Sequence, residues 1–161
     1  MSKSKVEPDR IDPDHQLKMP RSSGNVSNPS TSGDRRGSLL LVEDNLVNQK
    51  VAVHILTRLG YSVQVACNGL EALDQFRANR FDAILMDCQM PVMDGFEATS
   101  AMRSSELPSR RTPIIAVTAN GLGEQREKCF AVGMDDFLPK PISSESLQVT
   151  LDKWLVPAER N

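Results

Sequence analysis

The sequence lacks any apolar run long enough to cross a bilayer, and its polar N-terminus has no apolar core of the kind found in signal peptides. It also lacks a strong net charge: the formal charge is -2 at pH 7, so nothing general favours nucleic acid or an anionic membrane as a partner. The three cysteines, Cys67, Cys88 and Cys129, are odd in number and have no CxxC spacing, which argues against a disulfide framework and a zinc site. We therefore expect a cytoplasmic protein with reduced thiols, no membrane insertion and no direct contact with nucleic acid.

The first 37 residues lack the regularly spaced apolar residues that a core requires. They are rich in Ser, Pro, Asn, Asp and Arg, and they carry a net charge of +2 against -4 for residues 38–161. Because such a composition buries too little surface to offset the entropy of ordering, we predict a disordered tail or linker at residues 1–37. His15-Gln16-Leu17-Lys18 faintly resembles the surroundings of a phosphotransfer histidine. Pro13 and Pro20 bracket it, however, and no apolar helix face is present, so we interpret His15 as a solvated residue.

From Ser38 onward, strand patterns alternate five times with helix patterns. The strands are predicted at 39–42, 62–67, 81–86, 113–117 and 136–138, and the helices at 47–59, 70–76, 96–103, 121–132 and 143–155. The apolar face of the first helix is predicted from a four-residue spacing: Val47, Val51, Ile55 and Leu59. Alternation with short connections implies one domain with a parallel sheet, helices on both faces and right-handed crossovers.

Asp87 ends the apolar run of the third predicted strand, and Pro91 and Asp94-Gly95 mark the turn before the next helix. Ligands of open α/β sheets bind at the carboxyl ends of central strands. Taken alone, Asp87 is equally well explained as an ordinary turn residue, because Asp is common at such turns. The other strand ends therefore decide between the two interpretations.

Polar residues follow the other strands as well: Glu43-Asp44 the first, Thr118 the fourth and Lys140 the fifth. Because parallel strands end at the same edge of a sheet, these groups are expected to converge on Asp87. Crowded carboxylates need a cation, and oxygen ligands suit Mg²⁺, which Mn²⁺ could replace. An Asp carboxylate can act as the nucleophile that forms an aspartyl-phosphate, with Lys140 and Thr118 binding further phosphoryl oxygens.

Four segments together resemble the receiver domain of response regulators: Leu41-Val42-Glu43-Asp44-Asn45, Met86-Asp87-Cys88-Gln89-Met90-Pro91-Val92-Met93-Asp94-Gly95, Thr118-Ala119-Asn120 and Lys140-Pro141. The resemblance covers about Ser38 to Leu155 and is greatest to the receivers of hybrid sensor kinases in multistep phosphorelays. It implies an α/β, flavodoxin-like (βα)5 fold, doubly wound, with a five-stranded parallel sheet in the order 2-1-3-4-5. We accordingly predict a receiver domain at 38–156 and a C-terminal tail at 157–161.

The resemblance also implies a role for each residue at the strand ends: Asp87 as phosphoacceptor, Glu43, Asp44, Asp87 and the Gln89 carbonyl as Mg²⁺ ligands, Thr118 as switch hydroxyl, Phe137 as switch aromatic, Lys140 as phosphate-binding ammonium and Pro141 as the residue after a cis bond. Two positions depart from the common pattern. Phe137 stands where many receivers have Tyr, and Glu43 stands where Asp is commoner. Gln89 and Asn120 flank the site and are expected to tune the lifetime of the phosphate.

The function implied is that of a phosphoacceptor in a two-component phosphorelay. A histidine kinase or a histidine phosphotransfer protein would donate a phosphoryl group to Asp87 in the presence of Mg²⁺. The face formed by 121–132, 136–138 and the last helix would then be remodelled, and it could also form a dimer. Such a domain is not a classical enzyme, and we expect no output domain in this chain. It is either free-standing or a fragment of a hybrid sensor histidine kinase.

Three other classes of protein are alternatives to a receiver domain. A haloacid-dehalogenase-type phosphatase uses similar groups, but its nucleophile resembles Asp-x-Asp on the first strand, whereas Asp87-Cys88-Gln89 lies on the third. A flavin-binding protein needs a phosphate loop after the first strand, where Glu43-Asp44-Asn45 would repel phosphate. A phosphate-independent interaction module is the remaining alternative, and the complete set of site residues argues against it.

Overall fold

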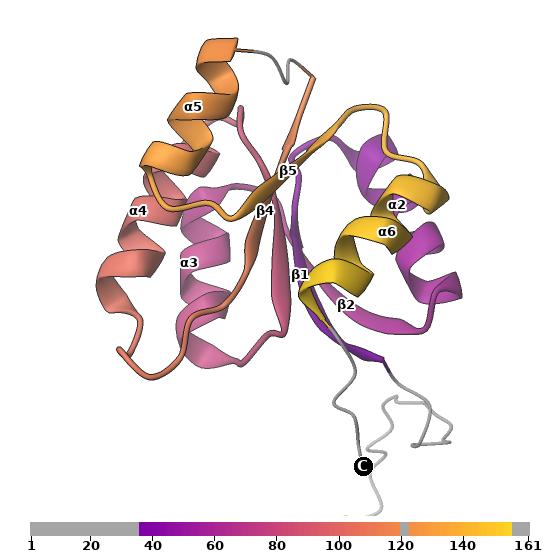
Figure 1. The fold of residues 1–161 in the computed structure, drawn as a ribbon, viewed down its shortest axis with the longest axis horizontal. Helices are drawn as coiled ribbons and strands as arrows, with labels where there is room; N and C mark the ends of the chain where they lie inside the picture. The colour runs from indigo at the N-terminus through magenta and orange to yellow at the C-terminus, as the bar shows by residue number, and fades with distance from the viewer. Residues whose placement is uncertain (1–35, 120–122, 156–161) are drawn as a thin grey trace, which may run out of the picture. The chain divides into compact units, whose positions relative to one another are not determined.

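The computed structural model describes residues 36–119 and 123–155, in which strands and helices alternate along the chain (Figure 1). The elements are β1 (Gly37–Val42), α2 (Leu46–Arg58), β2 (Tyr61–Ala66), α3 (Gly69–Ala78), β3 (Ala83–Asp87), α4 (Gly95–Ser105), β4 (Ile114–Thr118), α5 (Gly123–Ala131), β5 (Asp136–Pro139) and α6 (Ser144–Trp154). The sheet has the order β2-β1-β3-β4-β5 with every neighbouring pair parallel, which confirms the predicted fold class. Within the described residues, no helix combines the length and the hydropathy needed to cross a membrane.

Helices cover both faces of the sheet, with α3, α4 and α5 on one face and α2 and α6 on the other (Figure 1). Alternate residues of one strand therefore enter different cores. Leu40 and Val42 of β1 pack in the first core, whereas Leu39 and Leu41 pack in the second. Because the central strands are buried on both faces, β3 and β4 are apolar at nearly every position. This packing fixes the position of each strand end.

Side-chain caps set the starts of the helices. Asp94 accepts a hydrogen bond from the Glu97 N–H at 2.9 Å and thereby caps α4. Ser143 is the cap of α6, as predicted, and accepts from the Ser146 N–H at 3.1 Å. Strand β2 ends at Ala66, one residue before the predicted end, because the Cys67 N–H donates to the Glu71 carboxylate at 2.7 Å instead of to a neighbouring strand.

The predicted apolar face of the first helix was partly wrong. The buried residues of α2 are Ala52 and Leu56, while Val47 is 67% exposed and Val51 is 48% exposed. A spacing of four residues advances by more than one helical turn, so the stripe winds away from the core toward the N-terminus of the helix. The turn of α2 next to β1 therefore presents apolar side chains to solvent.

Asp136, at the start of β5, ties this strand to the last turn of α6. The Trp154 indole N–H donates to Asp136 Oδ2 at 2.8 Å, Lys153 Nζ lies 3.2 Å from the same oxygen, and the Phe137 N–H donates to Oδ1 at 2.9 Å. Burial raises the pKa of Asp136, but these hydrogen bonds outweigh burial and hold the pKa below its ordinary value of 3.8. The ionised carboxylate therefore stabilises the fold.

This stabilisation has a defined pH window. Because the folded-state pKa is lowered, the contribution is complete above about pH 5 and is lost as the pH falls through the ordinary value toward the folded-state pKa. We expect Asp136→Asn to lower the free energy of unfolding more at pH 6 than at pH 3, as measured by urea denaturation. Asp74→Asn, which changes an exposed carboxylate of α3, is the control and should show no such difference. An equal loss at both pH values in Asp136→Asn would contradict the assignment.

Candidate functional site

Asp87 is the last residue of β3, and it is only 4% exposed. The Gln89 N–H donates to Asp87 Oδ1 at 3.2 Å and so orients the carboxylate. The Gly95 N–H donates to the Cys88 carbonyl at 3.1 Å, which folds the loop after β3 back against the strand end. The loop thus leaves Asp87 Oδ2 directed toward the other strand ends.

The loop after β3 contains two constrained positions. Val92 has a φ of 71°, and the Met93 N–H donates to the Pro91 carbonyl at 2.7 Å, which together define a strained γ-turn. Gly95 has no room for a side chain, because a Cβ there would overlap the Asp87 carbonyl and lie 3.0 Å from Cys88 Cα. The predicted turn at Asp94-Gly95 is therefore also a close approach of two backbones.

We expect Gly95→Ala to destabilise the domain by about 2 kcal/mol, since the new methyl group must displace the backbone that carries Asp87. Urea denaturation measures the loss. Ser100→Ala, at an exposed position of the same helix, is the matched control and should change stability by less than about 0.5 kcal/mol. Wild-type stability in Gly95→Ala would show that the loop relaxes without cost.

Three carboxylates meet beside the end of β3. One oxygen each from Glu43, Asp44 and Asp87 lies within 4.8 Å of the others. Glu43 is as buried as Asp87, whereas Asp44 is exposed. Lys140 Nζ lies 3.2 Å from Glu43 Oε2 and 3.4 Å from Asp87 Oδ2. When the three carboxylates and the Lys140 ammonium are all ionised, their net charge is -2. Such an oxygen-rich set fits a divalent cation such as Mg²⁺.

The groups of this cluster shift one another's protonation. Burial raises the pKa of Asp87 to about 7, with the hydrogen bond and charge of Glu43 adding to it and Lys140 opposing it. Burial alone would raise the pKa of Glu43. The hydrogen bond with Asp87 and the charge of Lys140 outweigh burial, so the net effect is a lowered pKa. Burial alone would lower the pKa of Lys140. The charges of Asp87 and Glu43 outweigh burial, so the pKa is raised and this ammonium stays charged. Asp87 is therefore the carboxylate whose charge most needs a further cation.

Thr118 and Phe137 lie on neighbouring strands. Thr118 is buried at the end of β4, and its carbonyl accepts from the Lys140 N–H at 2.9 Å. Phe137 pairs in register with Ala116, two residues before Thr118, so both side chains project from the same face of the sheet. The Phe137 ring is half-buried, and the Arg126 guanidinium lies 4.6 Å from its centroid. The Lys140–Pro141 bond is cis.

Some residues at the site were missed, and others cannot be placed. Gln49 Nε2 donates to the Glu43 carbonyl at 2.7 Å and so holds the acidic pair against α2. No role was assigned to Gln49 from sequence, because a single Gln in a helix gives no sign of a contact six residues earlier. His54 is exposed on α2. His15 and Asn120 lie outside the described residues.

The comparisons with known proteins agree with this geometry. The family model described as the response regulator receiver domain matches residues 39–152, and the chain belongs to this family. It is 46% identical over 117 residues to the hybrid signal transduction protein dokA of Dictyostelium discoideum, covering 73% of this chain and 7% of that protein. Eight of the most similar curated relatives are hybrid signalling proteins or histidine kinases, and the chain spans 3–16% of their lengths.

Two solved structures are informative about such sites. The receiver domain of the sensor histidine kinase PA1611 of Pseudomonas aeruginosa, with magnesium coordinated in its active site cleft, is 46% identical with a TM-score of 0.70, covering 75% of this chain and 98% of that one. The Saccharomyces cerevisiae receiver domain of Ssk1, solved with the histidine phosphotransfer protein Ypd1, is 29% identical with a TM-score of 0.68, covering 73% of this chain and 88% of that one. The predicted family and strand order are thus confirmed.

Proposed function

We propose that this domain accepts a phosphoryl group on Asp87 from a phosphohistidine of a histidine kinase or a histidine phosphotransfer protein. The observation that carries the proposal is the convergence of Asp87, Glu43, Asp44 and Lys140 at one edge of the sheet. The receiver that was solved with a phosphotransfer protein supports the class of donor. The chain spans only a small share of its hybrid-kinase relatives, and we assign residues 38–156 to the receiver domain of either a free-standing protein or a hybrid kinase.

Each residue of the cluster has its own role in the transfer. An Asp87 carboxylate oxygen attacks the phosphorus, the P–N bond breaks, and the histidine leaves as a neutral imidazole once it holds a proton. Lys140, whose ammonium already faces Asp87 Oδ2, binds an oxygen of the incoming group, and the Thr118 hydroxyl binds another. Glu43, Asp44, Asp87 and the Gln89 carbonyl would hold Mg²⁺. When bound, the ion would neutralise charge on the phosphoryl group.

An apolar surface beside the site supports docking of a protein donor. A cavity of about 390 Å³ is bounded by Glu43, Lys140, Pro141 and Ile142, and by Val51 of α2. The other exposed apolar residues of α2 lie in its first turn. Val51 of the exposed stripe thus lines the same cavity as Glu43 and Lys140. Exposed apolar side chains beside such a site are typical of a protein-binding surface.

Phosphorylation would switch the α5–β5–α6 face. A phosphoryl group adds nearly two negative charges, toward which Thr118 would turn, and Phe137 would then move inward. Phe137 lacks the hydroxyl of Tyr, so the change would be transmitted by packing alone. A dimer through this face is a further prediction of the family resemblance, and Mn²⁺ is expected to replace Mg²⁺.

Transfer from a labelled phosphohistidine donor tests the proposal. We expect label on the domain with Mg²⁺ and at least about a tenfold lower rate with excess chelator, because charge on the phosphoryl group is then uncompensated. Titration calorimetry should detect Mg²⁺ binding to the wild type and weaker binding to Asp44→Asn. Equal labelling without a divalent cation would overturn the metal assignment. Turnover of an unrelated phosphomonoester would instead show a phosphatase.

A further inference from the structure

A second cavity lies at the opposite edge of the sheet, where the strands begin. It has a volume of about 260 Å³ and lies between the end of α3, the segment that leads into β3 and the loop between α4 and β4. Phe76, Phe81 and Leu107 give it an apolar lining. Asp87 lies at the other end of β3, so this cavity plays no part in the proposed phosphoryl transfer.

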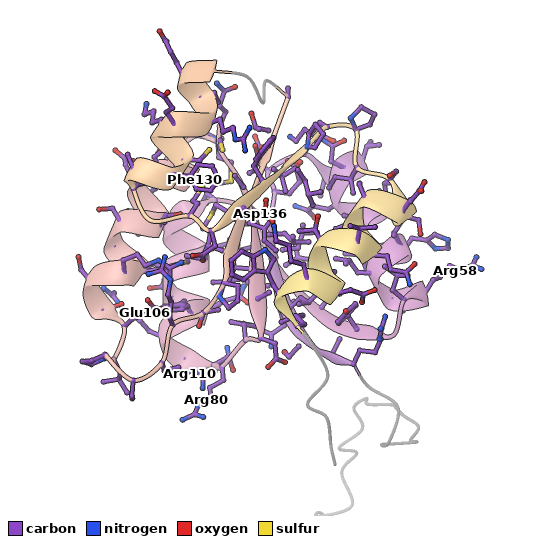
Figure 2. All side chains as sticks on the ribbon, viewed as in Figure 1. Arg58, Arg80, Glu106, Arg110, Phe130 and Asp136 are labelled. Carbon is purple, nitrogen blue, oxygen red and sulfur yellow. The ribbon has the colours of Figure 1, made fainter. Side chains whose placement is uncertain are left out.

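Three arginines from separate elements line this cavity. Arg77 comes from the last turn of α3, Arg80 from the segment before β3, and Arg110 from the α4–β4 loop. Figure 2 shows Arg80 and Arg110 extending near each other at this edge, with Glu106 close by. In the part of the chain that the structure describes, none of the three guanidinium groups has an ion-pair partner. The rim therefore carries three positive charges without compensation in the described residues.

The one carboxylate among the described lining residues is already engaged. Glu106 accepts two hydrogen bonds from Arg103 Nη1, at 2.9 and 3.0 Å, and a third from the Thr112 N–H at 2.8 Å. Arg103 Nη1 also donates to the Thr112 carbonyl at 2.9 Å. Glu106 is therefore paired with Arg103 and not with any of the three rim arginines.

The same bonds hold the α4–β4 loop at both ends. Within the loop, the Arg110 N–H donates to the Leu107 carbonyl at 3.0 Å and closes a turn. Leu107 is nevertheless 66% exposed. A fixed loop therefore presents an apolar side chain beside a guanidinium group that has no ion-pair partner among the described residues. Such pre-organisation lowers the entropic cost of binding.

We propose that this cavity binds an acidic segment of a partner protein. The cavity is smaller than the roughly 300–1,000 Å³ that encloses a drug-sized molecule, so it suits one or two side chains. An apolar side chain of the segment enters between Phe81 and Leu107, and flanking carboxylates pair with the three arginines. Recognition of acidic motifs by arginine clusters uses the same chemistry. The apolar lining distinguishes such a segment from a simple inorganic anion.

The proposal is tested with a fluorescein-labelled peptide of Asp and Glu that carries one central Leu, by fluorescence anisotropy at low salt. We expect saturable binding, weakened about tenfold in the variant that combines Arg77→Gln, Arg80→Gln and Arg110→Gln, since three exposed ion pairs with the peptide are lost. Arg58→Gln removes an exposed arginine at the end of α2, which lies on the opposite side of Figure 2 from Arg80 and Arg110, and should change binding by less than about twofold. Circular dichroism spectra of all variants verify that they are folded.

Four further results would contradict or redefine the proposed peptide site. Absence of binding at low salt, or an equal loss in Arg58→Gln, would overturn the proposal. Equal binding of a peptide with Ser in place of Leu would reduce it to general charge attraction. Displacement of the peptide by inorganic pyrophosphate at equal concentration would identify an anion site instead. Asp87→Asn should bind the peptide like the wild type, because the cavity acts independently of the phosphoacceptor.

Discussion

Asp87→Asn is expected to reduce phosphoryl transfer from a phosphohistidine donor to background. The amide is nearly the same size as the carboxylate but is a far weaker nucleophile, and removing the nucleophile of a covalent mechanism typically costs several orders of magnitude in rate. Stability should not fall, because the substitution removes one of three crowded negative charges. The measurement is transfer of label from the donor at saturating Mg²⁺, followed by identification of the labelled peptide.

Two controls make this result specific. Asp74→Asn, at an exposed position of α3, should accept label at the wild-type rate. Thermal unfolding of Asp87→Asn should show that the variant is folded. If the folded variant were labelled as well as the wild type, the acceptor would be another residue, and the proposed function would fail at its central assignment.

Arg103→Ala is expected to lower the free energy of unfolding by about 3 kcal/mol, as measured by urea denaturation. Arg103 is 13% exposed and pairs with Glu106 and with Asp135, each of them 10% exposed. It also donates to two backbone carbonyls, those of Thr112 and Gly133, each at 2.9 Å. Truncation leaves two largely buried carboxylates and two carbonyls without this donor, which is the costly outcome for a charge network.

Arg111→Ala is the matched control for this prediction. Arg111 also donates to Asp135, at 2.7 Å, and to the Gly133 carbonyl, at 3.1 Å, but its side chain is 58% exposed. Because solvent screens an exposed pair, the expected loss is below about 1 kcal/mol. The loss of stability in Arg103→Lys should lie between those of Arg103→Ala and Arg111→Ala, since one ammonium cannot make all the hydrogen bonds of the planar guanidinium. Equal losses from Arg103→Ala and Arg111→Ala would show that burial does not govern this network.

The fold and most of the candidate site were predictable because their causes are local. An apolar run followed by a carboxylate, as at Asp87, marks both a buried strand and its end. Parallel pairing then places Glu43, Thr118 and Lys140 at the same edge without any knowledge of loop geometry. The sequence could therefore indicate which residues meet, although not their distances.

Features that depend on packing between distant segments could not be predicted. The exposed stripe on α2 arises because four-residue spacing drifts by about 40° per step around a helix, so Val47 lies about 80° around the helix from Ile55 and outside the buried sector. The contact of Arg103 with Asp135 joins residues 32 apart in sequence, and no periodicity marks it. The close approach of Gly95 to the Asp87 carbonyl likewise requires the folded loop.

The parallel sheet also has a consequence for how this domain can evolve. The loops that follow the strands hold the acidic cluster around Asp87, whereas those that lead into β3, β4 and β5 hold the Arg103 network and the arginine-lined cavity. Substitutions at one edge can therefore alter a binding preference without disturbing the chemistry at the other. In a library of random variants, loss of phosphate acceptance with an intact fold should map to the loops that follow the strands. Loss of expression should map mainly to the loops that precede the strands and to the two cores.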